Sequence, residues 1–339
     1  MSSARKKFSI LLLIFAIALS VTIPSYAKRL KGCDYVSYHS PCWMPDSKHI
    51  VYIKHISHHK YRYGWIAAIS KGGDLWVGSD CYVYKMNIET RKEEVIKKFI
   101  TTYNHKISEE GKKKSDREKY FVEENGKAKS FPYKMESFKI DCSKDGKWIC
   151  FNSGTLHLLS ADGKILKRLP VSVGSPKFSP DGKRILYGVS SDVRTSEGEY
   201  VRKKPDLRLI DIDGTNDRLL VENATNGIWH PSGKKIAYHR EKDNYSTYIM
   251  DLETKEKTLL VDNTGYPSDW SPDGRYINFI GRVLDMEGKR LKTGFKSIPR
   301  FGKFSPDGLK MIGEKLGITF SKVGDGEETI LLKDYSKEY

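Results

Sequence analysis

Five histidines in the N-terminal third of the chain have the clearest potential for chemistry. They are His39, His55, His58, His59 and His105. Neutral imidazoles bind transition metals, and a metal-dependent lyase or hydrolase acting on acidic polysaccharide would use such an ion to acidify a proton beside a carboxylate. His58 and His59 are adjacent, so they would face opposite sides of a strand. Their polar surroundings favour a solvated loop over a metal site.

Four charged residues form a second candidate site, because each stands immediately before a copy of a short recurring motif. They are Asp141, Lys177, Asp269 and Lys303. Cys42 and Ile228 hold the same position before the other two copies. If each copy belongs to one unit of a radial structure, these side chains surround a central channel and could meet a ligand there. The alternative is that the four charges only pair with one another across the channel.

The motif itself is Phe/Trp-Ser-Pro-Asp-Gly. Its clear copies are 178–182, 270–274 and 304–308, and its looser copies are 43–47, 142–146 and 229–233. Proline presets φ for the first corner of a turn, aspartate hydrogen-bonds to nearby backbone, and glycine takes a positive φ. Each copy therefore joins two antiparallel strands. The bulky residue at its start is expected to pack against the neighbouring unit.

Strand patterns surround each turn and define the repeating unit. Apolar alternation follows the turn, as at 50–53, 148–151 and 236–238, and such a period-two pattern is typical of a strand. A second hairpin signature comes downstream, as at 207–214 and 248–254. Six such units, each of four antiparallel strands, predict an all-β, six-bladed β-propeller. A degenerate extra blade would make seven.

The first interval between motif copies is too long for one blade of roughly 40–50 residues. It contains a polar, lysine-rich run at 108–119. We therefore expect an insertion at about 101–137, which includes a hairpin at 120–131, within a propeller domain that spans 28–339.

The N-terminal segment 1–27 has the pattern of a signal peptide. Three basic residues precede the apolar run 8–23, and Ser25 and Ala27 are the small residues that a signal peptidase reads. Cleavage after Ala27 would lower the formal charge from +16 to +13. The alternative is retention as an uncleaved anchor, although the run is short for a span of roughly 20 residues. We expect a periplasmic or secreted protein.

Cysteine usage and charge fit that location. The chain has five cysteines, which permit two disulfides and leave one thiol, and their connectivity stays open at this stage. A strongly basic protein outside the cytoplasm would meet anionic glycans, lipid head groups or acidic proteins, and we expect no nucleic-acid partner. A solvated lysine-rich surface without a specific ligand is the plainer alternative.

The Phe/Trp-Ser-Pro-Asp-Gly-Lys/Arg repeat resembles that of the TolB-like propellers. The same group of repeats includes the propeller domains of prolyl oligopeptidase-type enzymes and of periplasmic oligogalacturonate lyases. The resemblance covers nearly all of the chain after Ala27, but it excludes the α/β domain of TolB, because the first repeat here begins at Trp43. No Gly-x-Ser-x-Gly nucleophile elbow occurs in the sequence, so a serine peptidase is not expected. The repeat is specific for fold and weak for function.

These observations favour an exported, non-catalytic propeller that needs no cofactor. We expect it to act as a scaffold that binds an envelope protein or an anionic glycan, with membrane-surface contact as a further option. The alternative is the metal-dependent lyase or hydrolase, with the five histidines among the ligands.

Overall fold

The recurring motif folds into a hydrogen-bonded turn, which the computed structural model repeats from blade to blade. The Oγ of Ser179 donates to Asp181 and accepts from the backbone N–H of Arg184 at 2.9 Å. The backbone of Gly182 has a φ of 69°, in the left-handed region that favours glycine. The same bonds recur at 143–148, 271–276 and 305–310. The predicted turn and its positive-φ glycine are confirmed.

The structure describes most of the chain after the N-terminal segment. The described residues are 31–61, 74–102, 120–124, 127–131, 139–152, 155–169, 174–189, 192–194, 200–202, 205–240, 245–262, 265–291, 298–299, 301–314, 317–322 and 329–333. Within them all regular secondary structure is β-strand.

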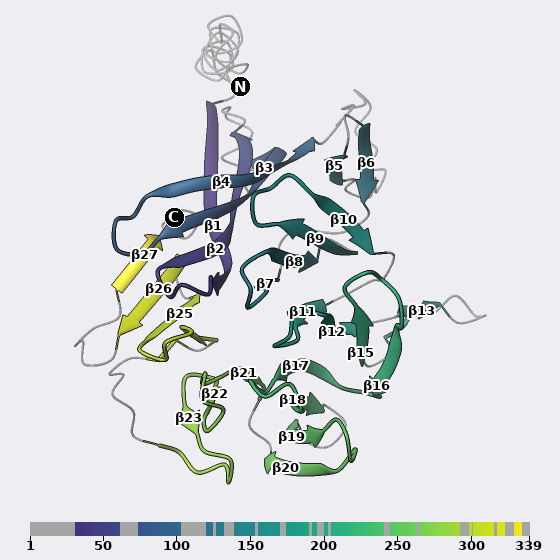
Figure 1. Ribbon diagram of the computed structural model, residues 1–339. Coiled ribbons are helices and arrows are strands. Elements are labelled where there is room, and N and C mark those ends of the chain that lie inside the picture. Colours follow the sequence, from purple (N-terminus) through teal and green to yellow (C-terminus); the bar gives the residue numbers. More distant parts are fainter. Residues whose placement is uncertain are drawn as a thin grey trace, which may run out of the picture.

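Six antiparallel sheets, blades 1 to 6 in chain order, follow one another around a central axis (Figure 1). Blades 1 to 3 consist of β1 (Lys31–Trp43), β2 (His49–Tyr61), β3 (Asp74–Asn87) and β4 (Glu93–Thr102); β7 (Ile140–Cys142), β8 (Trp148–Asn152), β9 (Leu156–Ser160) and β10 (Leu166–Leu169); and β11 (Gly174–Phe178), β12 (Arg184–Val189), β15 (Asp206–Asp211) and β16 (Arg218–Val221). Blades 4 to 6 consist of β17 (Thr225–Trp229), β18 (Lys235–Arg240), β19 (Ser246–Asp251) and β20 (Lys257–Val261); β21 (Pro267–Trp270), β22 (Ile277–Phe279) and β23 (Val283–Leu284); and β24 (Lys303–Phe304), β25 (Lys310–Glu314), β26 (Gly317–Lys322) and β27 (Thr329–Lys333). The predicted all-β, six-bladed propeller is confirmed.

Blade 5 differs from the prediction of four strands, because its sheet has three among the described residues. After β23 the chain makes only an isolated bridge between Leu284 and Arg290. Two hairpins lie outside the six sheets. They pair β5 (Tyr120–Glu124) with β6 (Lys127–Phe131), and β13 (Asp192–Arg194) with β14 (Tyr200–Arg202). The first of them is the hairpin predicted at 120–131.

Large side chains at the start of four motif copies pack between consecutive blades, as predicted, whereas Phe304 of the last copy is only half-buried. Phe178 is buried among blade 2 residues, Trp229 among blade 3 residues and Trp270 among blade 4 residues. Trp43 packs against Ile312 and Ile318 of blade 6. Apolar burial of this kind is the main term that holds successive blades together.

Side chains, and not an exchanged strand, join the last blade to the first. All four strands of blade 6 come from consecutive C-terminal segments. Across the junction, the backbone N–H of Asp307 donates to Ser47 Oγ at 3.0 Å, and Lys310 Nζ donates to the Ser47 carbonyl at 3.0 Å. The backbone N–H of Ser40 also donates to the Glu314 carboxylate. Among the described residues, no helix is long and apolar enough to cross a membrane.

Candidate functional site

The six residues that immediately precede the motif copies form one layer around the channel, and we call them the ring residues. They are Cys42, Asp141, Lys177, Ile228, Asp269 and Lys303. Each lies on the innermost strand of its blade, at the end where the motif turn begins. The repeated turn therefore sets a common register, and residues far apart in sequence reach the same depth.

The two aspartates of the ring hold neighbouring blades together. Asp141 Oδ2 accepts a hydrogen bond from the backbone N–H of Phe178 at 3.0 Å, and Asp269 Oδ2 accepts one from Phe304 at 2.8 Å. In both cases the carboxylate reaches the motif of the next blade. Bonds of a carboxylate to backbone N–H groups are charge-assisted, so each aspartate ties two adjacent blades at the channel wall.

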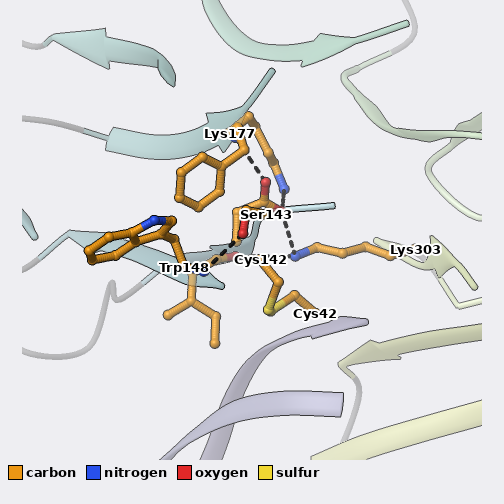
Figure 2. Close-up of a disulfide and its surroundings, with 9 residues drawn as sticks. Cys42, Cys142, Ser143, Trp148, Lys177 and Lys303 are labelled. Atoms are coloured by element: carbon orange, nitrogen blue, oxygen red, sulfur yellow. Dashed lines mark hydrogen bonds and ion pairs between the residues drawn. A yellow bond between two sulfur atoms is a disulfide. The ribbon is translucent and has the colours of Figure 1, made fainter. Parts of the chain in front are cut away.

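The two lysines of the ring converge on one carboxylate. Lys177 Nζ lies 3.5 Å and Lys303 Nζ 3.9 Å from Oδ1 of Asp141, and Lys303 Nζ also donates to the Ile140 carbonyl at 3.2 Å. Figure 2 shows the two lysine side chains pointing toward each other beside the disulfide. Three of the four predicted charged residues are therefore in direct contact, as the ion-pairing alternative expected.

Burial and mutual repulsion shift the charges of this cluster. Burial and the neighbouring Lys177 together lower the pKa of Lys303 to about 7, against the opposing effect of the two aspartates. Burial also raises the pKa of Asp269 to about 6. For Lys177, burial opposes the charged form, but the carboxylates of Asp141 and Asp269 outweigh it and raise its pKa. At neutral pH, Lys303 is thus the lysine that gains or loses a proton easily.

The ring repeats after three blades. An uncharged residue, an aspartate and a lysine follow in order in blades 1 to 3 and again in blades 4 to 6. The indole N–H of Trp43 donates to the carbonyl of Lys303 at 3.1 Å, and that of Trp229 to the carbonyl of Lys177 at 3.3 Å. The two halves thus repeat each other in side-chain type and in hydrogen bonds.

A disulfide joins blades 1 and 2 at the position where an aspartate joins blades 2 and 3. Cys42 of the ring is bonded to Cys142, the first residue of the next motif copy, across a sequence separation of 100 residues (Figure 2). Cys81 and Cys150 are buried thiols, and burial raises the pKa of both. The side chain of Cys33 lies outside the described residues. One of the two disulfides that the cysteine count permits is therefore present.

A recess of about 240 Å³ opens at the channel mouth. Its wall contains the ring residues Lys177, Ile228 and Lys303. It also contains the residue two positions before the ring residue of every blade, and we call these six the mouth residues: Ser40, Lys139, Ser175, Asn226, Pro267 and Phe301. Every blade thus contributes to one cavity. This layer was not predicted, although the motif register that identified the ring residues locates it two residues earlier in each blade.

Three of the mouth residues have a backbone conformation that is rare outside glycine. The φ values are 51° for Ser40, 44° for Ser175 and 50° for Asn226. All three lie at register shifts in the innermost strands of blades 1, 3 and 4. Bulges and left-handed residues of this kind re-aim side chains and concentrate at functional sites. Their repetition around the mouth marks this end of the channel as the candidate site.

The histidines do not gather at the channel among the described residues. His39 and His55 lie on one face of blade 1, where the His39 ring bonds to Ser37 Oγ at 2.7 Å. His58 lies in the same blade, 3.7 Å from Asp80. Together with His59 it belongs to strand β2, so the predicted loop at these positions was wrong. The side chain of His59, and the whole of His105, lie outside the described residues.

No set of three or more metal-ligating side chains is found within the part of the chain that the structure describes. The metal-dependent enzyme stays an untested prediction.

Comparisons with known proteins give structural likeness only. No known protein family and no curated protein sequence matches the chain. The structure is similar to an acylaminoacyl peptidase of Pyrococcus horikoshii, with 13% identity, a TM-score of 0.48, and coverage of 88% of this chain and 46% of that one. It is also similar to a puromycin hydrolase, with 11% identity, a TM-score of 0.45, and coverage of 86% of this chain and 54% of that one. A third similar structure is the Cps50 (Swd1) β-propeller domain of Myceliophteria thermophila, with 11% identity, a TM-score of 0.43, and coverage of 86% of this chain and 99% of that one. The chain spans about half the length of the two hydrolytic proteins.

Proposed function

We propose that this protein is an exported, non-catalytic propeller of the TolB-like repeat group, which serves as a binding scaffold in the cell envelope. Its partner is a protein or an anionic glycan that docks at the channel mouth. The observation that carries the proposal is the recess to which all six blades contribute, with Lys177 and Lys303 in its wall. A concave site with a few convergent charged groups is the usual form of a binding site.

The charge of the site supports an anionic partner. Lys139, Lys177 and Lys303 are in the wall of the recess, and the carboxylate in that wall, Glu314, accepts the backbone N–H of Ser40. Asp141, which is not in the wall, pairs with Lys177 and Lys303 from behind it. The whole chain carries a formal charge of +16, which attracts anionic partners at long range.

Export is supported by two independent features. The segment 1–27 has the charge and hydropathy pattern of a signal peptide. The Cys42–Cys142 disulfide joins two blades, and disulfides persist in oxidising compartments outside the cytoplasm. The TolB-like assignment depends on the repeated Phe/Trp-Ser-Pro-Asp-Gly turns.

Photo-crosslinking in intact cells tests the binding role. A photoreactive amino acid at Ser175 places the probe in the mouth, and the same probe at Leu219, which is 43% exposed on the outermost strand of blade 3, is the matched control. We expect a discrete adduct from Ser175 alone. Equal labelling from both positions, or none from either, would contradict docking at the mouth. Fractionation of the same cells checks export.

Elemental analysis separates the scaffold from the enzyme alternative. The purified protein is measured before and after dialysis against a chelator. The scaffold proposal expects no stoichiometric transition metal. A stoichiometric metal that only the chelator removes would contradict it and would favour the metal-dependent lyase or hydrolase, with the histidines as ligands.

A further inference from the structure

A row of aromatic rings extends from the recess across blades 4 to 6. Phe301 stacks on Tyr266 with centroids 6.4 Å apart, Tyr266 contacts the His239 ring edge-to-face at 4.9 Å, and His239 stacks on Tyr245 at 5.9 Å. We call these four residues the aromatic row. Phe301, Tyr266 and Tyr245 are 45%, 38% and 55% exposed. Exposed aromatic side chains grouped beside a cavity are typical of a recognition surface.

The row and the recess form one continuous site, because Tyr266 and Phe301 belong to both. The aromatic row therefore begins where the recess opens. Lys177 and Lys303 lie farther along the innermost strands. A ligand that spans both parts must carry an anionic group at one end and apolar groups behind it. The lysines at one end of the site and the aromatic rings at the other thus set the orientation of the ligand.

The rest of the wall combines apolar and polar side chains. Pro41, Ile140 and Ile228 offer no side-chain hydrogen-bonding group, whereas Ser40, Ser175, Asn226 and Ser268 do. An apolar side chain meets no desolvation penalty at the first set, and main-chain N–H and C=O groups of a peptide can bond to the second. The end of a peptide therefore fits both sets of wall residues.

The size of the recess fits the end of a chain. A volume of about 240 Å³ lies just below the roughly 300–1,000 Å³ of pockets that enclose a drug-sized ligand. This is room for a carboxylate and one attached apolar group, but not for a folded surface. The C-terminal carboxylate of a peptide can enter the recess while the rest of the peptide stays outside it.

We propose that the recess binds the C-terminal carboxylate of a peptide or protein partner, with Lys177 and Lys303 on the carboxylate and the last side chains of the partner on the aromatic row. This inference rests on the proposed binding role and names the chemistry of its partner. Binding relieves the repulsion between the two ammonium groups by placing a negative charge beside them. Asp141 keeps its bond to Phe178 N–H, so the wall of the channel stays intact.

Protonation of the cluster gives the site a pH dependence. The charged groups that face Lys303 are Lys177, Asp141 and Asp269, and Glu314 faces the same recess. Lys303 loses its proton as the pH rises through about 7, and Asp269 has already become negative above about 6. Deprotonation of Lys303 removes a positive charge from the wall of the recess, and ionisation of Asp269 adds a negative charge beside that lysine. Peptide retention therefore weakens from pH 6 to pH 9.

Two peptide pools test the proposal with the purified full chain. Both contain hexapeptides randomised at the last three positions and labelled at the N-terminus, and one pool ends in a free carboxylate while the other is amidated. We expect retention of the free-carboxylate pool to exceed that of the amidated pool by at least about tenfold, with apolar and aromatic final residues enriched, since a charge-assisted contact is lost on amidation. Equal retention of both pools, or retention of neither, would overturn the carboxylate site.

Variants locate the binding within the site. Lys177→Gln and Phe301→Ala should each reduce retention about tenfold, while Lys164→Gln, whose side chain is 81% exposed in a turn of blade 2, should leave it unchanged. Thermal unfolding checks that each variant is folded, and Phe301 is exposed enough to be replaced without loss of the core. Unchanged retention in both folded site variants would overturn the assignment.

Competitors separate the chemical classes. Galacturonate and inorganic phosphate are added at millimolar concentration to the bound peptides. Neither should displace them, because neither carries an apolar group for the aromatic row. Displacement by galacturonate would overturn the peptide assignment in favour of a glycan, and displacement by phosphate would reduce the site to a general anion site. If the Ser175 adduct forms in cells while the peptide pools fail, the carboxylate inference falls and the binding role stands.

Discussion

Blades 1 to 3 and blades 4 to 6 place the same sequence of side-chain types around the channel, yet they join their first two blades differently. In the first half, Cys42 is bonded to Cys142 of the next blade. In the second half, Ile228 shares a core cluster with Trp270 of the next blade. The covalent link falls where 100 residues separate the joined positions. In both halves the ring residue of the first blade contacts the next blade. The contact is a disulfide where the intervening chain is longest.

Loss of the disulfide should have the largest effect on this comparison. The double variant Cys42→Ala/Cys142→Ala should lose roughly 5 kcal/mol of unfolding free energy, because a cross-link that closes about 100 residues restricts the unfolded chain strongly. Urea denaturation measures the change. Reductant should destabilise the unaltered protein and leave the double variant unaffected. A loss below about 1 kcal/mol would mean that apolar packing alone joins blades 1 and 2.

The corresponding junction in the second half depends on packing. Trp270→Ala removes a side chain that is only 4% exposed between blades 4 and 5 and should cost roughly 3–5 kcal/mol. Tyr245→Ala, at an exposed ring in blade 4, is the control and should change stability by less than about 0.5 kcal/mol. If Trp270→Ala cost less than about 1 kcal/mol, Trp270 could not be the main contact at this junction.

The two lysines hold equivalent positions but should affect stability with opposite sign as the pH changes. The pKa of Lys303 is lowered to about 7 in the folded state, so between about 7 and its unfolded value of 10.5 the unfolded chain binds more protons. Stability therefore rises with pH in that window, and Lys303→Met should abolish the rise. The pKa of Lys177 is raised, so its contribution is present below 10.5 and is lost above it.

Unfolding by urea at pH 6, 7, 8, 9 and 10 compares the two variants. Lys177→Met is the comparison variant: it removes the repulsion that helps to lower the pKa of Lys303, but burial of Lys303 remains, so the rise above pH 7 should become smaller without disappearing. A rise of the same size in Lys303→Met and in the unaltered protein would show that Lys303 stays charged in the folded state.

The smallest effect concerns the turns of blades 3 and 6, which occupy equivalent places in the two halves. Gly182 and Gly308 have φ values of 69° and 74°, and an added Cβ would meet nothing closer than 3.8 Å at either. Gly182→Val and Gly308→Val should therefore each cost about 1–2 kcal/mol, from backbone strain alone. Differential scanning calorimetry measures both. Gly182→Asn should cost less, because asparagine tolerates this region, and an unchanged Tm in both valine variants would count against the turn assignment.

Much of the fold could be predicted from the sequence, because the turn is a local structure with its own chemistry. Proline, aspartate and glycine at fixed spacing define the hairpin wherever they occur, and the bulky first residue marks the buried face. The exceptions are also local. Blade 5 has three strands in the described residues, and β2 runs on to Tyr61, through residues whose polarity favoured a loop. Long-range pairing with β1 and β3 overrides the local preference there.

The candidate site was predictable only in part. The motif register identified the ring residues, but it could not show that Asp141 contacts both lysines. Nor could it identify the left-handed backbone of Ser40 and Ser175, because serine has no special preference for that region. The aromatic row combines residues from three blades that share no motif.

The repeating unit, the turn conformation and the depth at which each ring residue lies could all be predicted from the sequence. These features depend on a few neighbouring residues, whose steric and hydrogen-bonding preferences are the same in every copy. Four features became known only from the folded chain: the number of blades, the Cys42–Cys142 pairing, the shared contact of two lysines with one aspartate, and the recess that all six blades line. These features depend on distances across the closed circle, which exist only after the last blade has packed against the first.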